Sequence, residues 1–115
     1  MAAPRAPVAC VDLGTNTCHL LVARAGPDGN VTVLEDVQEI VRLGQDVDRT
    51  GMLHPDARQR ALESLARHAR RARAHGASTL ELVGTSALRD ARDGAAFARD
   101  LEEKTGFRVH IITGE

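Results

Sequence analysis

Aromatic side chains are almost absent from this sequence, which has two Phe, no Trp and no Tyr among its 115 residues. Proteins that bind single-stranded nucleic acid usually stack its bases on aromatic side chains, so this mode of binding is nearly excluded. A hydrophobic core must instead be built from Val, Leu, Ile and Ala. The hydrophobic fraction of 43% and the charged fraction of 27% are ordinary for a globular chain, and the length allows one domain.

Cysteine is also scarce, and no long apolar run is present. Cys10 and Cys18 are too few for a disulfide framework or a zinc site, so we expect both to pack in strands as small apolar side chains. Residues 1–7 lack the apolar segment of a secretory signal, and no stretch predicts a membrane span. We therefore expect a flexible N-terminus over 1–7, one domain over 8–115, and a location in the reducing cytoplasm.

A net charge of -1 gives no global attraction to nucleic acid or to an anionic membrane. The charge is uneven, however, because the segment from Ala57 to His75 is rich in arginine. Its basic residues are Arg58, Arg60, Arg67, Arg70, Arg71 and Arg73. Such a run at helical spacing usually forms a solvated face, which we favour. The alternative is a secondary track for a polyanion along residues 67–73, flanked by His68 and His75.

The first half of the chain is patterned for strands. Apolar runs at Val8 to Leu13 and Cys18 to Ala25 flank a short polar turn, which predicts two antiparallel strands. A cluster of turn residues at 26–30 follows, and spaced valines over 31–41 predict a third strand. The chain should therefore open as a three-stranded meander.

The second half alternates helices and strands. Beyond His54 the apolar spacing changes to that of a helix, which predicts a helix over 55–75 with Pro55 at its first position. A strand over 79–84, a helix over 93–105 and a strand from Arg108 to Thr113 follow. The order βββαβαβ, with its last two strands parallel, predicts an α/β fold with a mixed five-stranded sheet. This topology is the ribonuclease-H-like half-domain that occurs twice in actin-type ATPases and sugar kinases.

The turn after the first strand carries the residues with the clearest chemistry. Gly14 allows the backbone to approach a ligand, and the amides and hydroxyls of Thr15, Asn16 and Thr17 suit phosphate oxygens. Asp12, at the strand end, suits a Mg²⁺-bound water or orients an attacking water. Taken alone, these residues also make a good hairpin turn without any ligand, and that interpretation is favoured until the rest of the chain is considered.

Several segments together resemble one family, the exopolyphosphatase / guanosine pentaphosphate phosphohydrolase (Ppx/GppA) family, over residues 8–115. The segments are Val11-Asp12-Leu13-Gly14-Thr15-Asn16-Thr17 with His19-Leu20-Leu21-Val22-Ala23-Arg24, then Val41-Arg42-Leu43-Gly44, Gly84-Thr85-Ser86-Ala87-Leu88-Arg89-Asp90-Ala91 and Ile111-Ile112-Thr113-Gly114-Glu115. The third of these resembles a loop after the fourth strand. The resemblance implies a hydrolase that removes phosphate from inorganic polyphosphate or guanosine pentaphosphate, with Mg²⁺ as cofactor.

The resemblance also implies roles for single residues. Asp12, Gly14, Thr15 and Asn16 match the family's first phosphate loop, and Arg89 matches its phosphate-contacting arginine. Without the resemblance, Arg89 would be interpreted as a surface arginine paired with Asp90 or Asp93. His19 is expected to be a half-buried structural histidine rather than a base.

The family's general base would fall at position 117, beyond Glu115. Its second phosphate loop and metal-holding Asp would lie in another half-domain. We therefore expect this chain to be the N-terminal, phosphate-gripping half-domain, whose partners are that second half-domain, the phosphate substrate and, as an open possibility, a second copy in a homodimer.

Three alternatives remain at this stage. A sugar-kinase or acetate-kinase-like phosphotransferase would use the same first loop, and a chaperone or actin-type ATPase would share the topology. The third alternative is a non-catalytic phosphate-binding or regulatory module. The Thr85–Arg89 segment favours the phosphatase.

Overall fold

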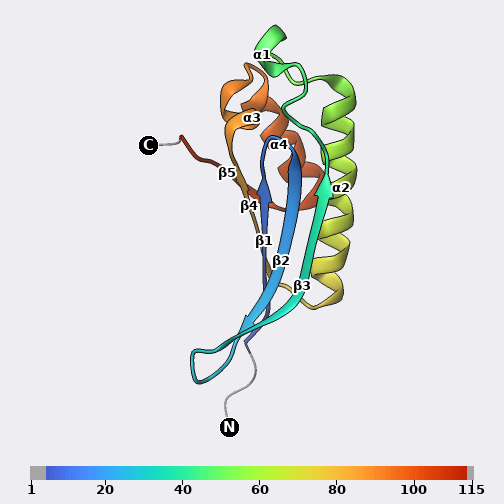
Figure 1. Cartoon of the computed structure of the whole chain (residues 1–115). Coiled ribbons are helices and arrows are strands. Elements are labelled where there is room, and N and C mark those ends of the chain that lie inside the picture. The colour runs from blue at the N-terminus through green and yellow to red at the C-terminus, as the bar shows by residue number, and fades with distance from the viewer. Residues whose placement is uncertain (1–4, 114–115) are drawn as a thin grey trace.

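Five strands form one mixed sheet in the order β3-β2-β1-β4-β5 in the computed structural model, which describes residues 5–113 (Figure 1). The strands are β1 (Val8–Leu13), β2 (Thr17–Ala25), β3 (Val31–Ile40), β4 (Thr79–Gly84) and β5 (Arg108–Ile111). β1 pairs antiparallel with β2 and parallel with β4, and β5 pairs parallel with β4. The predicted fold class and mixed sheet are therefore confirmed. Residues 1–4 of the expected flexible N-terminus, and Gly114 and Glu115, lie outside the described residues.

The helices include the two long ones expected from the sequence and two short ones that were not expected. They are α1 (Val47–Thr50), α2 (Pro55–Ala74), α3 (Ser86–Asp90) and α4 (Gly94–Thr105). Four or five residues are too few to show an apolar period, which is why the pattern did not reveal α1 and α3. The expectation of a loop over 84–91 was accordingly wrong.

A close packing contact seats α3 at the end of β4. Leu88 is buried, and a Cβ added at Gly84 would lie 2.3 Å from its Cδ1 atom. A Cβ added at Gly94 would lie 1.9 Å from the carbonyl oxygen of the same leucine. Two glycines therefore allow Leu88 to enter the core between β4 and α4, and this burial decides the local conformation.

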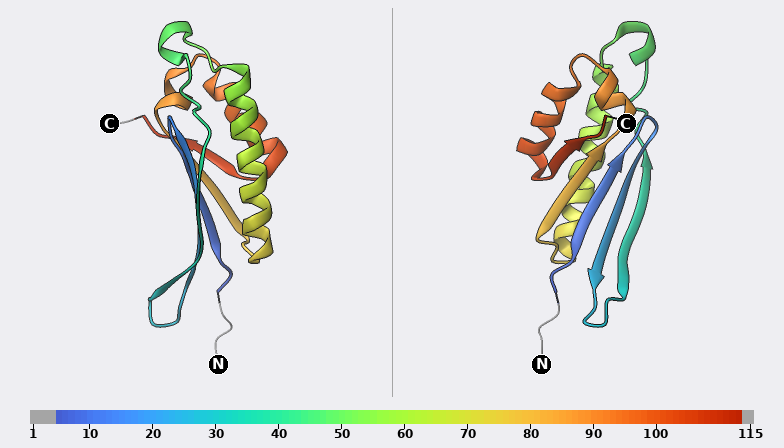
Figure 2. Two further views of the ribbon diagram at one scale, coloured as in Figure 1. Left: turned by 45° about the vertical axis from the view of Figure 1, so that its right-hand side comes forward. Right: turned by 90° about the vertical axis from the view of Figure 1, so that its left-hand side faces the viewer.

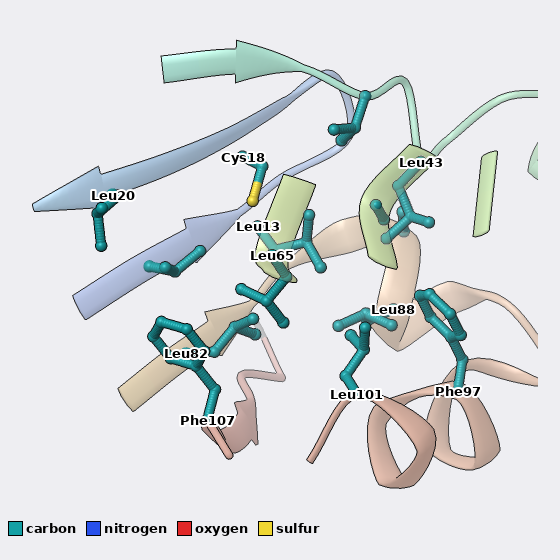
Figure 3. Packing of buried hydrophobic residues seen from close by; sticks show 14 of the residues in the cluster. Leu13, Cys18, Leu20, Leu43, Leu65, Leu82, Leu88, Phe97, Leu101 and Phe107 are labelled. Carbon is teal, nitrogen blue, oxygen red and sulfur yellow. The ribbon is translucent and has the colours of Figure 1, made fainter. Parts of the chain in front are cut away.

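The helices α2 and α4 cover one face of the sheet, while the other face is open in the described chain (Figure 2). Side chains alternate accordingly, and in β1 Ala9, Val11 and Leu13 are buried while Val8, Cys10 and Asp12 are exposed. Figure 3 shows leucines from strands and helices meeting in one cluster with Phe97 and Phe107. Each fully buried leucine or phenylalanine contributes about 1.5–3 kcal/mol through removal of its surface from water.

The two cysteines differ in their surroundings. Cys18 is fully buried in the core, and burial is the main cause that raises the pKa of its thiol to about 11. Cys10 also lies in a strand, as expected, but on the open face, where it is exposed instead of packed as an apolar core side chain. The alternation along β1 explains the difference, because residues 9 and 11 take the core positions.

A polar network fixes α2 against the sheet. Glu39 of β3 accepts hydrogen bonds from Ser64 Oγ at 2.5 Å and from Arg67 Nη2 at 3.0 Å, and it forms an ion pair with Arg71 at 3.2 Å. Burial alone would raise the pKa of Glu39, but the hydrogen bonds from Arg67 and Ser64 lower it to about 2. The carboxylate therefore stays charged in a site where its side chain is only 19% exposed.

His68 extends this network into the core. It is fully buried, although the sequence placed it beside a solvated basic face. Arg71 Nη1 lies 3.0 Å from His68 Nδ1, and since arginine only donates, the proton of a neutral His68 sits on Nε2, which lies 3.1 Å from the carbonyl oxygen of Cys18. Burial lowers the pKa of His68 and keeps it neutral. The arginines at 67 and 71 are thus engaged within the fold.

We expect Glu39→Gln to lower the free energy of unfolding by about 1–3 kcal/mol, because it leaves two arginines and Ser64 without a charged acceptor. The pKa of Glu39 is depressed from 4.5 to about 2 in the folded state. Its contribution is therefore complete above about pH 4.5 and declines as the pH falls towards 2. Urea unfolding of both proteins between pH 7 and pH 3 should show their difference shrinking with acid. The exposed Glu63→Gln change on α2 is the control and should have an effect within about 0.5 kcal/mol.

Candidate functional site

The carbonyl groups of the loop between β1 and β2 accept hydrogen bonds from backbone amides of residues 41–44. Asn16 O accepts from Val41 N at 2.8 Å and from Arg42 N at 2.9 Å, and Thr15 O accepts from Gly44 N at 2.9 Å. Among residues 5–113, the amides of Thr15 and Asn16 donate to no protein acceptor. Consecutive free amides on a fixed loop are the arrangement that binds anions in proteins.

The β1–β2 loop contacts two segments that are distant from it in the sequence, residues 41–48 and residues 85–90. Thr85 N donates to Leu13 O at 3.1 Å, which joins the end of β4 to the end of β1. A pocket of about 90 Å³ lies between the segments, and it is lined by Thr15, Gly44, Val47, Asp48, Ser86, Ala87 and Asp90. In Figure 1 the loop lies at the same end of the sheet as α1 and α3, opposite the β2–β3 hairpin. The carboxyl ends of β1 and β4 therefore share an edge where ligands gather in α/β sheets.

Two glycines of this region have different surroundings. A Cβ added at Gly44 would lie 2.3 Å from Thr15 Cγ2, so only glycine permits this approach of the two segments. A Cβ added at Gly14 would meet its nearest neighbour, Thr85 Oγ1, at the ordinary distance of 3.6 Å. The fold thus requires glycine at position 44, whereas it leaves ordinary space for a side chain at position 14.

The two residues expected to be catalytic lie on different elements. Asp12 is in β1, and its side chain is exposed on the open face of the sheet. Arg89 is in α3, where its Nε donates to Asp90 Oδ1 at 3.0 Å. This is the surface pair that the sequence offered as the alternative for Arg89. The pair is weak because Arg89 is 33% and Asp90 57% exposed, so a phosphate could replace the carboxylate as acceptor.

The other candidates near the loop have structural partners. His19 Nε2 and Asp36 Oδ1 lie 2.5 Å apart across β2 and β3, which agrees with a half-buried structural histidine. Asp93, the second possible partner of Arg89, instead accepts from Leu53 N at 2.9 Å and pairs with Arg58 at 3.6 Å. The sequence missed Asp90 as part of the pocket lining, since nothing in its spacing indicated α3.

Within residues 5–113, no three His, Cys, Asp or Glu side chains lie close enough together to bind a metal ion. No helix in the described part of the chain has the length and apolarity to cross a membrane.

The sheet order and the connection of β1 to β4 define the class of this domain as a ribonuclease-H-like half-domain of the α/β type. Comparison with known proteins identifies the family to which this half-domain belongs. The model of the Ppx/GppA phosphatase family matches residues 21–115. The chain therefore belongs to the Ppx/GppA phosphatase family.

Individual relatives agree with this assignment. The guanosine-5'-triphosphate,3'-diphosphate pyrophosphatase of Vibrio cholerae is 34% identical over 93% of this chain. The crystal structure of the Aquifex aeolicus Ppx/GppA family member matches 96% of the chain with a TM-score of 0.89 and 25% identity. An exopolyphosphatase from Cytophaga hutchinsonii matches 92% with a TM-score of 0.86, also at 25% identity. The chain spans 21% of the Vibrio relative and 36% and 34% of the two solved chains.

The contrast between the glycines gives a direct test of the loop's packing. Gly44→Ala should lower the free energy of unfolding by about 1–3 kcal/mol, because the new methyl group overlaps Thr15. Gly14→Ala should change it by no more than about 0.5 kcal/mol. Urea unfolding of both variants measures this, and Thr15→Ser, which removes Cγ2, should restore part of the stability of Gly44→Ala. Equal losses for the two single variants would contradict the packing described here.

Proposed function

We propose that this chain is the phosphate-gripping N-terminal part of a phosphohydrolase. The enzyme would remove the terminal phosphate of inorganic polyphosphate, the 5′ γ-phosphate of guanosine pentaphosphate, or both. The observation that carries the proposal is the β1–β2 loop, which directs its carbonyls to its own chain and leaves the amides of Thr15 and Asn16 free. Family membership and the names of the relatives support the reaction type and the two substrates.

The residues at this edge of the sheet have complementary roles in the proposed reaction. The loop amides, with the hydroxyls of Thr15 and Thr17, would hold the oxygens of the terminal phosphate, and Gly14 would allow its close approach. Phosphoryl transfer spreads negative charge over those oxygens. Arg89, released from Asp90, would neutralise that charge through its forked guanidinium.

Asp12 is the residue of this chain that would hold Mg²⁺, through a bound water. The ion, when bound, would shield the phosphate charge from the incoming nucleophile. Because Asp12 is exposed on the open face, it can reach such a water without breaking a contact within the core. The same carboxylate would also suit the alternative role of orienting the attacking water.

The remaining parts of the site would come from sequence outside these 115 residues. We propose residues 8–115 as one phosphate-binding half-domain that faces a second half-domain across the substrate. The general base and the second phosphate loop would belong to the part of the relatives that this chain does not span. A cytoplasmic location and a homodimer are compatible with this proposal.

The 115-residue chain by itself should bind phosphate compounds but not hydrolyse them, because a phosphate-binding loop without a general base does not activate the attacking water. Release of phosphate from polyphosphate and guanosine pentaphosphate by the purified chain should stay at the rate of the buffer. Turnover above that rate that disappears in Arg89→Ala would show that the chain contains its own base.

A longer protein in which sequence beyond residue 115 is present tests the role of Arg89. Arg89→Ala should lower kcat by about 100- to 1000-fold, as expected when one preorganised donor to developing charge is lost. Arg89→Lys should recover only part of the rate, because a point charge cannot replace the forked contact. Steady-state kinetics on both substrates give kcat and KM separately.

The matched control for Arg89→Ala is Arg99→Ala. Arg99 is an exposed arginine on α4, so its loss changes the net charge equally but should leave kcat unchanged. If both variants lost the same activity, or if Arg89→Ala raised KM alone, the proposed role in charge neutralisation would be wrong.

A further inference from the structure

A second and larger hollow lies at the outer edge of the sheet. Its volume is about 550 Å³, and it is lined by Ile40, Arg42, Gln45 and Arg60. Ile40 ends the edge strand β3 and is 72% exposed, so it forms an apolar wall beside the two arginines. Two positive groups beside an apolar surface make a place where a bound anion would be held more strongly than in open water.

The arginines of this hollow have no carboxylate partner in the described chain. Arg60 donates from Nε to Val41 O at 2.8 Å and from Nη2 to Gln45 Oε1 at 2.6 Å, and both acceptors are neutral. The side chain of Arg42 donates to no acceptor among residues 5–113. Arg67 and Arg71, further along α2, instead share the carboxylate of Glu39. The positive charges of Arg42 and Arg60 are therefore not neutralised by a carboxylate of the described residues.

The guanidinium of Arg60 is held in one orientation. Its two hydrogen bonds fix the plane of the guanidinium while the N–H groups of Nη1 stay without a partner in the described residues. A guanidinium held in one orientation loses little conformational freedom when it binds an anion. This is the condition under which an arginine recognises a phosphate group well.

Arg42 holds an unusual backbone conformation. Its φ of 51° lies in the left-handed region, which a residue with a long side chain rarely adopts. The conformation is fixed by Arg42 N, which donates to Asn16 O at 2.9 Å, and by Gln45 N, which donates to Arg42 O at 3.0 Å. Glycine or asparagine would fit this position with less strain, and these two backbone bonds hold the arginine in this conformation.

We propose that the hollow formed by Ile40, Arg42, Gln45 and Arg60 is a second phosphate-binding subsite. This inference rests on the proposed function, because it assigns the hollow to phosphate groups of the substrate that the β1–β2 loop does not hold. The two places are adjacent, because Arg42 N donates to Asn16 O at 2.9 Å, and one ligand bearing several phosphates would span both. The phosphates belong either to the continuing polyphosphate chain or to the 3′-diphosphate of a guanosine ligand.

Binding to the 115-residue chain tests the subsite without any need for catalysis. Tripolyphosphate should shift the side-chain Nε–Hε NMR signals of Arg42 and Arg60 as well as the amide signals of the loop. The amides of residues 41, 42 and 44 do not report on the subsite alone, because they donate to the loop carbonyls. Arg42→Asn removes the guanidinium but keeps a residue that accepts the left-handed conformation. It should raise Kd by about three- to tenfold, the scale of one partly exposed charge-assisted contact, and the difference should diminish at high salt.

Two control variants accompany Arg42→Asn. Arg99→Asn makes the same chemical change on the exposed face of α4 and should leave Kd unchanged. Arg70→Asn removes an exposed arginine of α2 and tests the alternative polyanion track along residues 67–73. Urea unfolding of each variant identifies any loss of affinity that arises from a damaged fold.

The outcomes separate this inference from the proposed function. Shifts of the loop amides without shifts of the Arg42 and Arg60 side-chain signals, or an unchanged Kd for Arg42→Asn, would overturn the subsite and leave the loop assignment intact. Shifts of the two side-chain signals without shifts at 14–17 would support the subsite and contradict the proposed loop. Absence of binding would overturn both. Comparison of tripolyphosphate with guanosine pentaphosphate shows which source of phosphate loses more affinity in Arg42→Asn.

Discussion

The hydrogen bonds from residues 41–44 to the β1–β2 loop are the constraint on which the functional edge of the sheet depends. Thr15 and Asn16 give their carbonyl oxygens to the amides of Val41, Arg42 and Gly44, and these bonds hold two polar segments together at distances of 2.8–2.9 Å. A loop with its carbonyls engaged keeps its amides available for an anion. The same bonds fix Arg42 in its left-handed conformation at the edge of the second hollow.

The packing of Leu88 at the end of β4 positions the other residues at this edge of the sheet. Leu88 enters the core through space left by Gly84 and Gly94, and this contact packs α3, which carries Arg89 and Asp90, against the end of β4. Buried contacts far from any ligand thus position the residues of the pocket. The Glu39 network contributes in a similar way, because it fixes α2 and, through that helix, the guanidinium of Arg60.

The number of arginines on α2 does not by itself show how much positive charge is available to a ligand. In the sequence its arginines form one basic segment, but in the structure they have different partners. Arg67 and Arg71 neutralise Glu39, Arg73 donates to Thr105 O at 2.8 Å, and Arg60 faces the outer hollow. Charge count is a property of the sequence, whereas the charge left available to a ligand depends on which carboxylates the fold brings near.

The architecture and the candidate loop can be predicted from the sequence, because period-two and helical spacing, turn residues and family motifs are local signals. β1 to β5, α2, α4 and the turn at residues 14–17 could all be predicted in this way. The three-dimensional packing decides that Cys10 is exposed, that His68 is buried, that residues 86–90 form α3, and that Arg42 and Arg60 line one hollow. Each of these depends on contacts between segments distant in the chain, and such contacts leave no periodic mark in the sequence.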